Sequence, residues 1–177
     1  MSKVIYVFGP QHSGTRLFTC LIDRHPDVKG ILHQSFPSGK HQIYDEFSTS
    51  NQYDFDNCDF LIIVSRENEF INKSNIKGGL GAIAERAKTH IKNELLNIKI
   101  KNEDFYKNKV VQVSYEKLVS QKQSYLKKIL DRIGLDSSKY NFNFKGETHI
   151  PNDHLGQPNR NAMVRMKITD GNAKYRT

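Results

Sequence analysis

The sequence predicts an α/β protein with a central parallel sheet flanked by helices. Strand-like segments and amphipathic helical segments alternate along the chain, which is the order that a parallel sheet with crossover helices produces. The strand-like segments are apolar throughout, as expected of strands covered on both faces. The 177 residues contain no repeat, low-complexity tract or linker, so we expect one domain spanning residues 1–177.

Four short apolar segments are predicted as strands. Lys3–Phe8 reads KVIYVF without polar alternation, and Asp59–Val64, which reads DFLIIV, has the same pattern. Val28–Leu32 and Lys109–Val113 complete the set. The polar stretch 33–53 shows only weak periodicity and is expected to form a loop or a short helix.

Three segments carry apolar residues at helical spacing. Thr15–His25 places four apolar side chains on one face and is ended by Pro26. Ala82–Ile98 is amphipathic, and so is Ser120–Ile133, which stops at a glycine. The last 40 residues are polar.

The composition narrows the choice of partner and compartment. The net charge of +8 favours an anionic partner, but no Arg-rich or aromatic-interleaved segment marks a nucleic-acid module, so we expect no nucleic-acid partner. The longest apolar runs have five residues, whereas a membrane span needs about 20, so neither a span nor a secretory signal is expected. Cys20 and Cys58 have no metal-ligand spacing. We expect reduced thiols, a cytoplasmic protein and no metal.

A glycine-bounded loop follows the first predicted strand and reads GPQHSGTR. Gly9 and Gly14 have the G-x4-G spacing of a P-loop, and the following helix start would direct backbone N–H groups at an anion. The next residues are Thr15 and Arg16, so the lysine and hydroxyl that serve ATP and Mg²⁺ are missing. We therefore predict a P-loop-type three-layer fold that binds phosphate without a metal. A glycine turn with no ligand is the alternative.

The segment Gln11–Leu17 resembles the 5′-phosphosulfate loop of the sulfotransferases that use 3′-phosphoadenosine 5′-phosphosulfate (PAPS). In that family a basic residue precedes Ser-Gly-Thr, and here His12 takes the place that is normally Lys or Arg. The continuation Leu21–Val28 is similar to the L-D-x-H-P-D-V stretch of tyrosylprotein and related bacterial sulfotransferases.

Two further segments resemble the same family. Its 3′-phosphate site has an arginine at a strand end and a serine eight positions later, as Arg66 and Ser74 are spaced here. A dianionic phosphate suits a guanidinium together with a hydroxyl. The segment Val113–Val119 resembles the family's V-R-Y-E-D-L, in which the tyrosine, here Tyr115, lines the adenine and 3′-phosphate region. We interpret Glu116 as structural.

The resemblance implies transfer of a sulfuryl group from PAPS to a hydroxyl acceptor, which is a sugar, a tyrosine or a small alcohol. It places His12 at the leaving oxygen, with Arg16 as a second source of positive charge. His33, which follows His12 by 21 residues and lies just beyond the predicted strand, is the candidate base, with His41 and Glu46 as rivals. The implied nucleotide-binding residues are Gln11, His12, Ser13, Gly14, Thr15, Arg16, Arg66, Ser74 and Tyr115.

Several alternatives stay open at this point. The chain is either an active sulfotransferase, a PAP- or PAPS-binding protein without turnover, or a P-loop kinase, which would require Mg²⁺-dependent ATP binding. Arg66 alternatively pairs with Glu67 or Glu69, Ser74 caps a helix, and Tyr115 is a core residue. The short chain leaves room for an acceptor pocket completed in a homo-oligomer, and Gly156–Arg160 is the candidate C-terminal nucleotide loop.

Parallel sheets bind ligands at the carboxyl ends of their strands. Gly9–Arg16, Ser65–Ser74 and Ser114–Leu118 each follow a predicted strand. We therefore expect these three segments to converge on one crevice.

Overall fold

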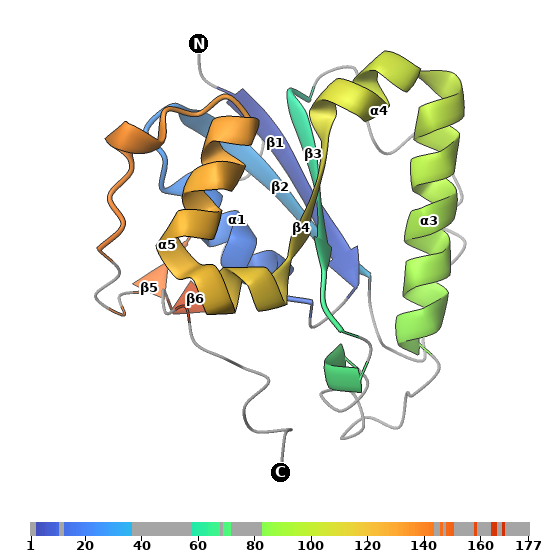
Figure 1. The fold of residues 1–177 in the computed structure, drawn as a ribbon, viewed down its shortest axis with the longest axis horizontal. Helices are drawn as coiled ribbons and strands as arrows, with labels where there is room; N and C mark the ends of the chain where they lie inside the picture. Colours follow the sequence, from blue (N-terminus) through green and yellow to red (C-terminus); the bar gives the residue numbers. More distant parts are fainter. Residues whose placement is uncertain are drawn as a thin grey trace.

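The computed structural model describes residues 3–10, 13–36, 58–67, 69–71, 83–143, 146, 148–150, 158, 164–165 and 168. It confirms the α/β class, because a four-stranded parallel sheet in the order β2-β1-β3-β4 is combined with helices (Figure 1). The elements are β1 (Lys3–Pro10), α1 (Thr15–Asp23), β2 (Val28–Phe36), β3 (Phe60–Ser65), α3 (Ile83–Lys101), α4 (Glu103–Lys109), β4 (Val110–Ser114), α5 (Tyr115–Arg132), the 3-10 helix η3 (Ser137–Lys139), β5 (Thr148–His149) and β6 (Val164–Arg165). The last two strands form a separate antiparallel pair.

Helices cover both faces of the sheet, and this explains why the strands read as apolar throughout. Figure 1 shows α1 and α5 on one face and α3 on the other. Alternate residues along a strand point to opposite faces. Ile5 and Val7 of β1 accordingly join the core cluster with α1 and α5, whereas Tyr6 and Phe8 join the cluster with α3.

The order of the strands places a topological switch point between β1 and β3. These two strands pair directly, with Ile5 opposite Phe60 and Phe8 opposite Ile63. The chain leaves β1 through α1 on one face, and it leaves β3 toward α3 on the other face. Neighbouring strands whose connections depart to opposite faces form the switch point at which α/β sheets bind ligands.

Two predicted boundaries around α1 and β2 are wrong. The helix ends at Asp23, two residues before the predicted end at His25. The strand β2 continues to Phe36, so His33 lies inside it, opposite Val7, and does not follow the strand. The polar residues after Leu32 suggested a loop, but their backbones pair with the end of β1, and such pairing needs no apolar side chain at the edge of a sheet.

The region around β4 contains more helix than predicted. The helix α4 was not predicted, although Asn102 caps it by accepting the Phe105 N–H at 2.9 Å. The helix α5 begins at Tyr115, five residues before the predicted start at Ser120. Its cap is Ser114, whose Oγ accepts the Lys117 N–H at 3.2 Å. In both cases a polar N-cap residue, Asn102 or Ser114, was the sequence signal that a helix begins.

The His-Pro-Asp stretch after α1 contacts the segment that follows α5. The imidazole of His25 is 1 % exposed, and its Nδ1 accepts the Asp27 N–H at 3.1 Å. Its Nε2 therefore carries the proton and donates to the Asp136 carbonyl at 2.9 Å. The Tyr140 hydroxyl donates to the Leu21 carbonyl and its ring stacks with His25. This stretch fastens the end of α1 to the chain that follows α5.

Replacing Tyr140 with phenylalanine tests how its hydroxyl contributes to stability at different pH values. Burial raises the pKa of the Tyr140 hydroxyl above its ordinary value of 10.0, so the folded protein keeps the proton at a pH where the unfolded chain loses it. That difference lowers the free energy of unfolding as pH rises above 10.0. We expect Tyr140→Phe to lose about 1 kcal/mol at pH 7 through its missing hydrogen bond. The difference in the free energy of unfolding between the variant and the wild type should be smaller at pH 11 than at pH 7, as measured by urea unfolding. The same difference at both pH values would contradict the expectation.

A backbone kink divides α5 at Lys122, whose φ of 46° and ψ of −116° are not helical. Glycine adopts this conformation without the steric penalty that a Cβ brings. We expect Lys122→Gly to raise the free energy of unfolding by about 1 kcal/mol. The matched variant Lys127→Gly, at an exposed position within the second half of α5, should lower it by about 1 kcal/mol. Equal destabilisation by both variants, measured by urea unfolding, would contradict the strain at Lys122.

Candidate functional site

The turn from β1 into α1 forms the first part of the candidate site. The Pro10 carbonyl accepts the Ser13 N–H at 3.0 Å, and the Gly14 carbonyl accepts the Phe18 N–H at 3.1 Å. Among the described residues no side chain caps α1 at Gly14, and the first turn of α1 contains no acidic residue. The positive end of the helix dipole therefore lies at the carboxyl edge of the sheet without a protein carboxylate in that turn.

Two glycines bring this turn close to its neighbours. A Cβ at Gly9 would lie 2.7 Å from the Val64 carbonyl oxygen and 2.6 Å from the Ser13 Oγ. A Cβ at Gly14 would lie 2.7 Å from the Cδ2 of Tyr115. Only a residue without a side chain permits either approach. The turn after β1 is thus packed against the end of β3 and the start of α5.

Arg66 and Tyr115 form the second part of the site. Arg66 directly follows β3 and is 9 % exposed, and Tyr115 is the first residue of α5 and is 7 % exposed. The Arg66 Cζ lies 4.7 Å from the centre of the Tyr115 ring, within the range of a cation–π interaction. One aromatic ring therefore contacts both Gly14 of the first turn and the guanidinium of Arg66.

Glu116 joins the segment after β3 to the start of α5. Its Oε1 accepts the Glu67 N–H at 3.0 Å, and its Oε2 accepts the Ser114 hydroxyl at 3.0 Å. The Ser65 hydroxyl donates to the Val113 carbonyl at 3.0 Å and links the ends of β3 and β4. The structural interpretation of Glu116 is confirmed, and its contact with Glu67 fixes the backbone immediately after Arg66.

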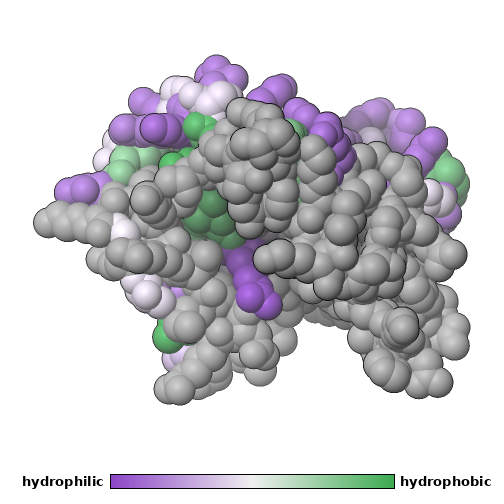
Figure 2. Space-filling view, turned by 90° about the horizontal axis from the view of Figure 1, so that it is seen from below, coloured by the Kyte–Doolittle hydropathy of each residue, from purple (hydrophilic) through white to green (hydrophobic). Residues whose placement is uncertain are grey.

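The described parts of the three predicted segments lie together at the carboxyl edge. Gly14, Arg66 and Tyr115 meet there, and Figure 2, which views the molecule from this end, shows hydrophilic and hydrophobic side chains side by side at its centre. The side chain of Arg16 is exposed in the first turn of α1, and Thr15 is 3 % exposed.

The hydroxyl of Ser13 is buried without a described hydrogen-bond partner. Its side chain is 0 % exposed, and its Oγ has no hydrogen-bond partner within the part of the chain that the structure describes. An unpaired buried hydroxyl is costly unless another donor or acceptor reaches it. A ligand oxygen held by this turn would satisfy it.

Several predicted site residues lie outside the described residues: Gln11, His12, Ser74, His41, Glu46 and, apart from Pro158, the loop Gly156–Arg160. His33 is described only in its backbone, within β2. Their roles stay predictions. The predicted position of His33 beyond the strand is wrong, because β2 extends three residues past it.

Comparison with protein-family models, curated proteins and solved structures found no match. Within the described ranges, no group of three or more His, Cys, Asp or Glu side chains is arranged to hold a metal ion. No helix among the same residues is long and apolar enough to cross a membrane. The chemistry of the site follows from its own geometry, which combines a helix N-terminus, a held guanidinium and an aromatic ring. This set suits a ligand that carries anionic groups on a planar body.

Sequence reasoning missed the contacts that join these parts. These contacts link residues that lie far apart in the chain. Gly14 approaches the Tyr115 ring, and the Glu67 N–H donates a hydrogen bond to Glu116. The early start of α5 was signalled by Ser114, a favoured N-cap residue directly after the apolar strand.

Proposed function

We propose that this chain is a PAPS-dependent sulfotransferase with a P-loop-type three-layer fold. The observation that carries the proposal is the contact of one ring, Tyr115, with both Gly14 and Arg66. These three residues belong to the three segments that resemble the sulfotransferase family. Their meeting at one strand edge supports a single ligand with anionic groups at two ends.

Each described part has a distinct role in this proposal. The turn at Ser13–Gly14 and the N-terminus of α1 bind the 5′-phosphosulfate, where the hydroxyl of Ser13 finds a partner. Arg66 binds the 3′-phosphate through its guanidinium, whose Cζ lies over the Tyr115 ring. Glu116 positions the backbone beside Arg66.

The proposed reaction moves a sulfuryl group between two oxygens. The acceptor oxygen forms a bond to sulfur while the bond from sulfur to the bridging phosphate oxygen breaks, and negative charge develops on that leaving oxygen. We assign His12 and Arg16 to this charge. His33 remains the candidate for accepting the acceptor's proton, and its place in β2 makes it a weaker candidate than its sequence spacing suggested.

Calorimetric titration with three nucleotides tests the binding step. We expect 3′,5′-diphosphoadenosine (PAP) to bind at least tenfold more tightly than AMP, which lacks the 3′-phosphate, and ATP to gain nothing from Mg²⁺. Equal affinity for PAP and AMP would overturn the proposal. Mg²⁺-dependent ATP binding would favour the kinase alternative.

A PAP- or PAPS-binding protein without turnover is the second candidate, and His12 favours it. The resembled family has Lys or Arg in that place, and a neutral imidazole lacks the fixed positive charge that the leaving oxygen needs. Incubation with PAPS and a panel of sugar, tyrosine and alcohol acceptors separates the two. Release of PAP that depends on an acceptor identifies the enzyme, whereas tight binding without release identifies the binding protein.

A further inference from the structure

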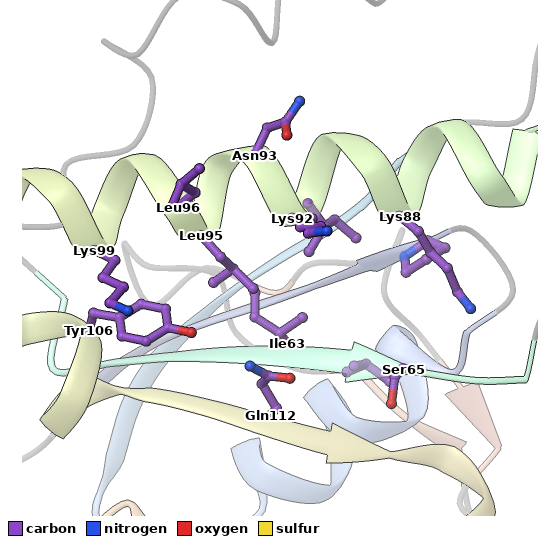
Figure 3. A pocket seen from close by; sticks show the side chains of 13 residues that line it. Ile63, Ser65, Lys88, Lys92, Asn93, Leu95, Leu96, Lys99, Tyr106 and Gln112 are labelled. Carbon is purple, nitrogen blue, oxygen red and sulfur yellow. The ribbon is translucent and has the colours of Figure 1, made fainter.

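A pocket of about 490 Å³ lies on the face of the sheet opposite α1 and α5 (Figure 3). Its walls come from α3, from Tyr106 of α4, from β3 and β4, and from Pro10 at the end of β1. The volume is within the range of small-molecule sites. Gly14, Arg66 and Tyr115 do not line the pocket, but Pro10, Val64 and Ser65 at the neighbouring strand ends do, so the pocket adjoins the candidate site.

The floor of the pocket is apolar. Ile63 of β3 and Ile91 of α3 are 9 % and 8 % exposed, and Leu95 is partly buried against the same cluster. Figure 3 shows the side chains of Ile63 and Leu95 pointing toward each other. Contact between this apolar floor and the hydrocarbon part of a ligand removes apolar surface from water and so favours binding.

The rim of the pocket is positively charged. Lys88, Lys92 and Lys99 of α3 line it, and its described lining residues include no aspartate or glutamate. Lys88 and Lys92 are four residues apart, a spacing at which like charges on a helix repel each other. Lys99 reaches the other end, with its Nζ 5.9 Å from the centre of the Tyr106 ring. A bound anion would relieve the repulsion between the lysines.

We propose that this pocket binds an amphipathic organic anion. The apolar body of the ligand lies on Ile63 and Leu95, and its carboxylate or sulfate group faces Lys88 and Lys92. The requirement for both parts follows from the apolar floor and the cationic rim, since neither a bare anion nor a neutral apolar molecule uses both. The lysines and the apolar floor take no part in the proposed PAPS site, which adjoins the pocket at Pro10, Val64 and Ser65, so the proposal stands whether or not the chain binds that nucleotide.

Calorimetric titration with 2-naphthoate tests the proposal, with acetate and 2-naphthylmethylammonium as the matched probes. We expect 2-naphthoate to bind at least tenfold more tightly than either, because acetate lacks the apolar body and the ammonium has the wrong charge. Equal affinity of the two naphthyl probes would overturn the role of the lysines. Equal affinity of acetate and 2-naphthoate would overturn the role of the apolar floor.

Two double variants and one single variant locate the binding. We expect Lys88→Gln with Lys92→Gln to weaken 2-naphthoate binding at least tenfold, and Gln112→Trp, which fills the pocket from β4, to do the same. Lys127→Gln with Lys128→Gln removes two exposed lysines of α5 and should leave the affinity unchanged. An equal loss of affinity for 2-naphthoate in the two double lysine variants would overturn the proposed site. Displacement of 2-naphthoate by PAP would overturn its separation from the nucleotide site, whereas absence of PAP binding would affect the proposed function alone.

Discussion

Replacing Arg66 with alanine is expected to lower the affinity for PAP by about 10- to 150-fold, which corresponds to roughly 1.5–3 kcal/mol for charge-assisted hydrogen bonds to the 3′-phosphate. The affinity for AMP should change by less than about threefold, because AMP lacks the group that the guanidinium is proposed to bind. The selectivity for the 3′-phosphate therefore disappears. Calorimetric titration of both nucleotides into the wild type and the variant measures this.

The effect depends on how the structure holds the guanidinium. Arg66 is 9 % exposed and lies over the Tyr115 ring, and the next residue, Glu67, is fixed by Glu116. Arg66→Lys keeps the charge but loses the planar fork of the guanidinium, so we expect an intermediate affinity for PAP. A lysine variant that matches the wild type would show that charge alone suffices.

Arg132→Ala is the matched control for Arg66→Ala. Arg132 is exposed on α5, and its guanidinium donates to the carbonyls of Lys107 and Asn108. The substitution removes the same charge from the molecule but not from the candidate site, so PAP affinity should stay near that of the wild type. A similar loss of PAP affinity in both variants would show that Arg66 acts only through the net charge of the protein. Parallel losses for PAP and AMP in Arg66→Ala would place the guanidinium away from the 3′-phosphate.

The sheet could be predicted from the sequence because its strands are covered on both faces. Each residue of Ile5–Phe8 and of Phe60–Val64 packs against one of two cores, so the apolar pattern is continuous and predicts a parallel arrangement. The end of β2 could not be predicted in the same way. The residues after Leu32 are held by backbone pairing with β1, which leaves no mark on side-chain hydropathy.

The candidate site could be predicted as a set of segments but not as a set of contacts. The rule that parallel strands end at one edge brought Gly14, Arg66 and Tyr115 into one region. Their contacts depend on how α5 begins, and that start was missed because Ser114 was not recognised as its cap. His25 shows the reverse case. It belongs to a stretch that resembles the sulfotransferases, yet in the structure its described contacts are with Asp136 and Tyr140, on either side of η3.

Replacing Gly14 with alanine is expected to lower the free energy of unfolding by about 2–4 kcal/mol, through backbone strain and overpacking together. Gly14 has a φ of 96°, where a Cβ brings strain, and the added Cβ would lie 2.7 Å from the Cδ2 of Tyr115. Any shift of the ring also disturbs Arg66, which lies over it. We therefore expect weaker PAP binding under conditions in which the variant remains folded. Urea unfolding and calorimetric titration measure the two effects.

Gly134→Ala separates a loss of stability from a loss of the site. Gly134 also has a positive φ, of 66°, but it lies after α5, where Leu135 closes the helix end by donating to the Leu130 carbonyl. We expect a loss of about 1 kcal/mol in stability with unchanged PAP affinity. Equal affinity losses in both glycine variants would trace the binding defect to general instability.

A double-mutant cycle then decides how much of the Gly14→Ala effect comes from the Tyr115 ring. Tyr115→Ala removes the atoms that the new Cβ meets, while the strain from φ at residue 14 remains. If the ring overlap dominates, the double variant is destabilised by less than the sum of the single variants, by about 1–3 kcal/mol. If the backbone strain dominates, the two losses add. The first outcome ties the turn after β1 to the ring that carries Arg66, and the second leaves the turn and the ring as independent parts of the molecule.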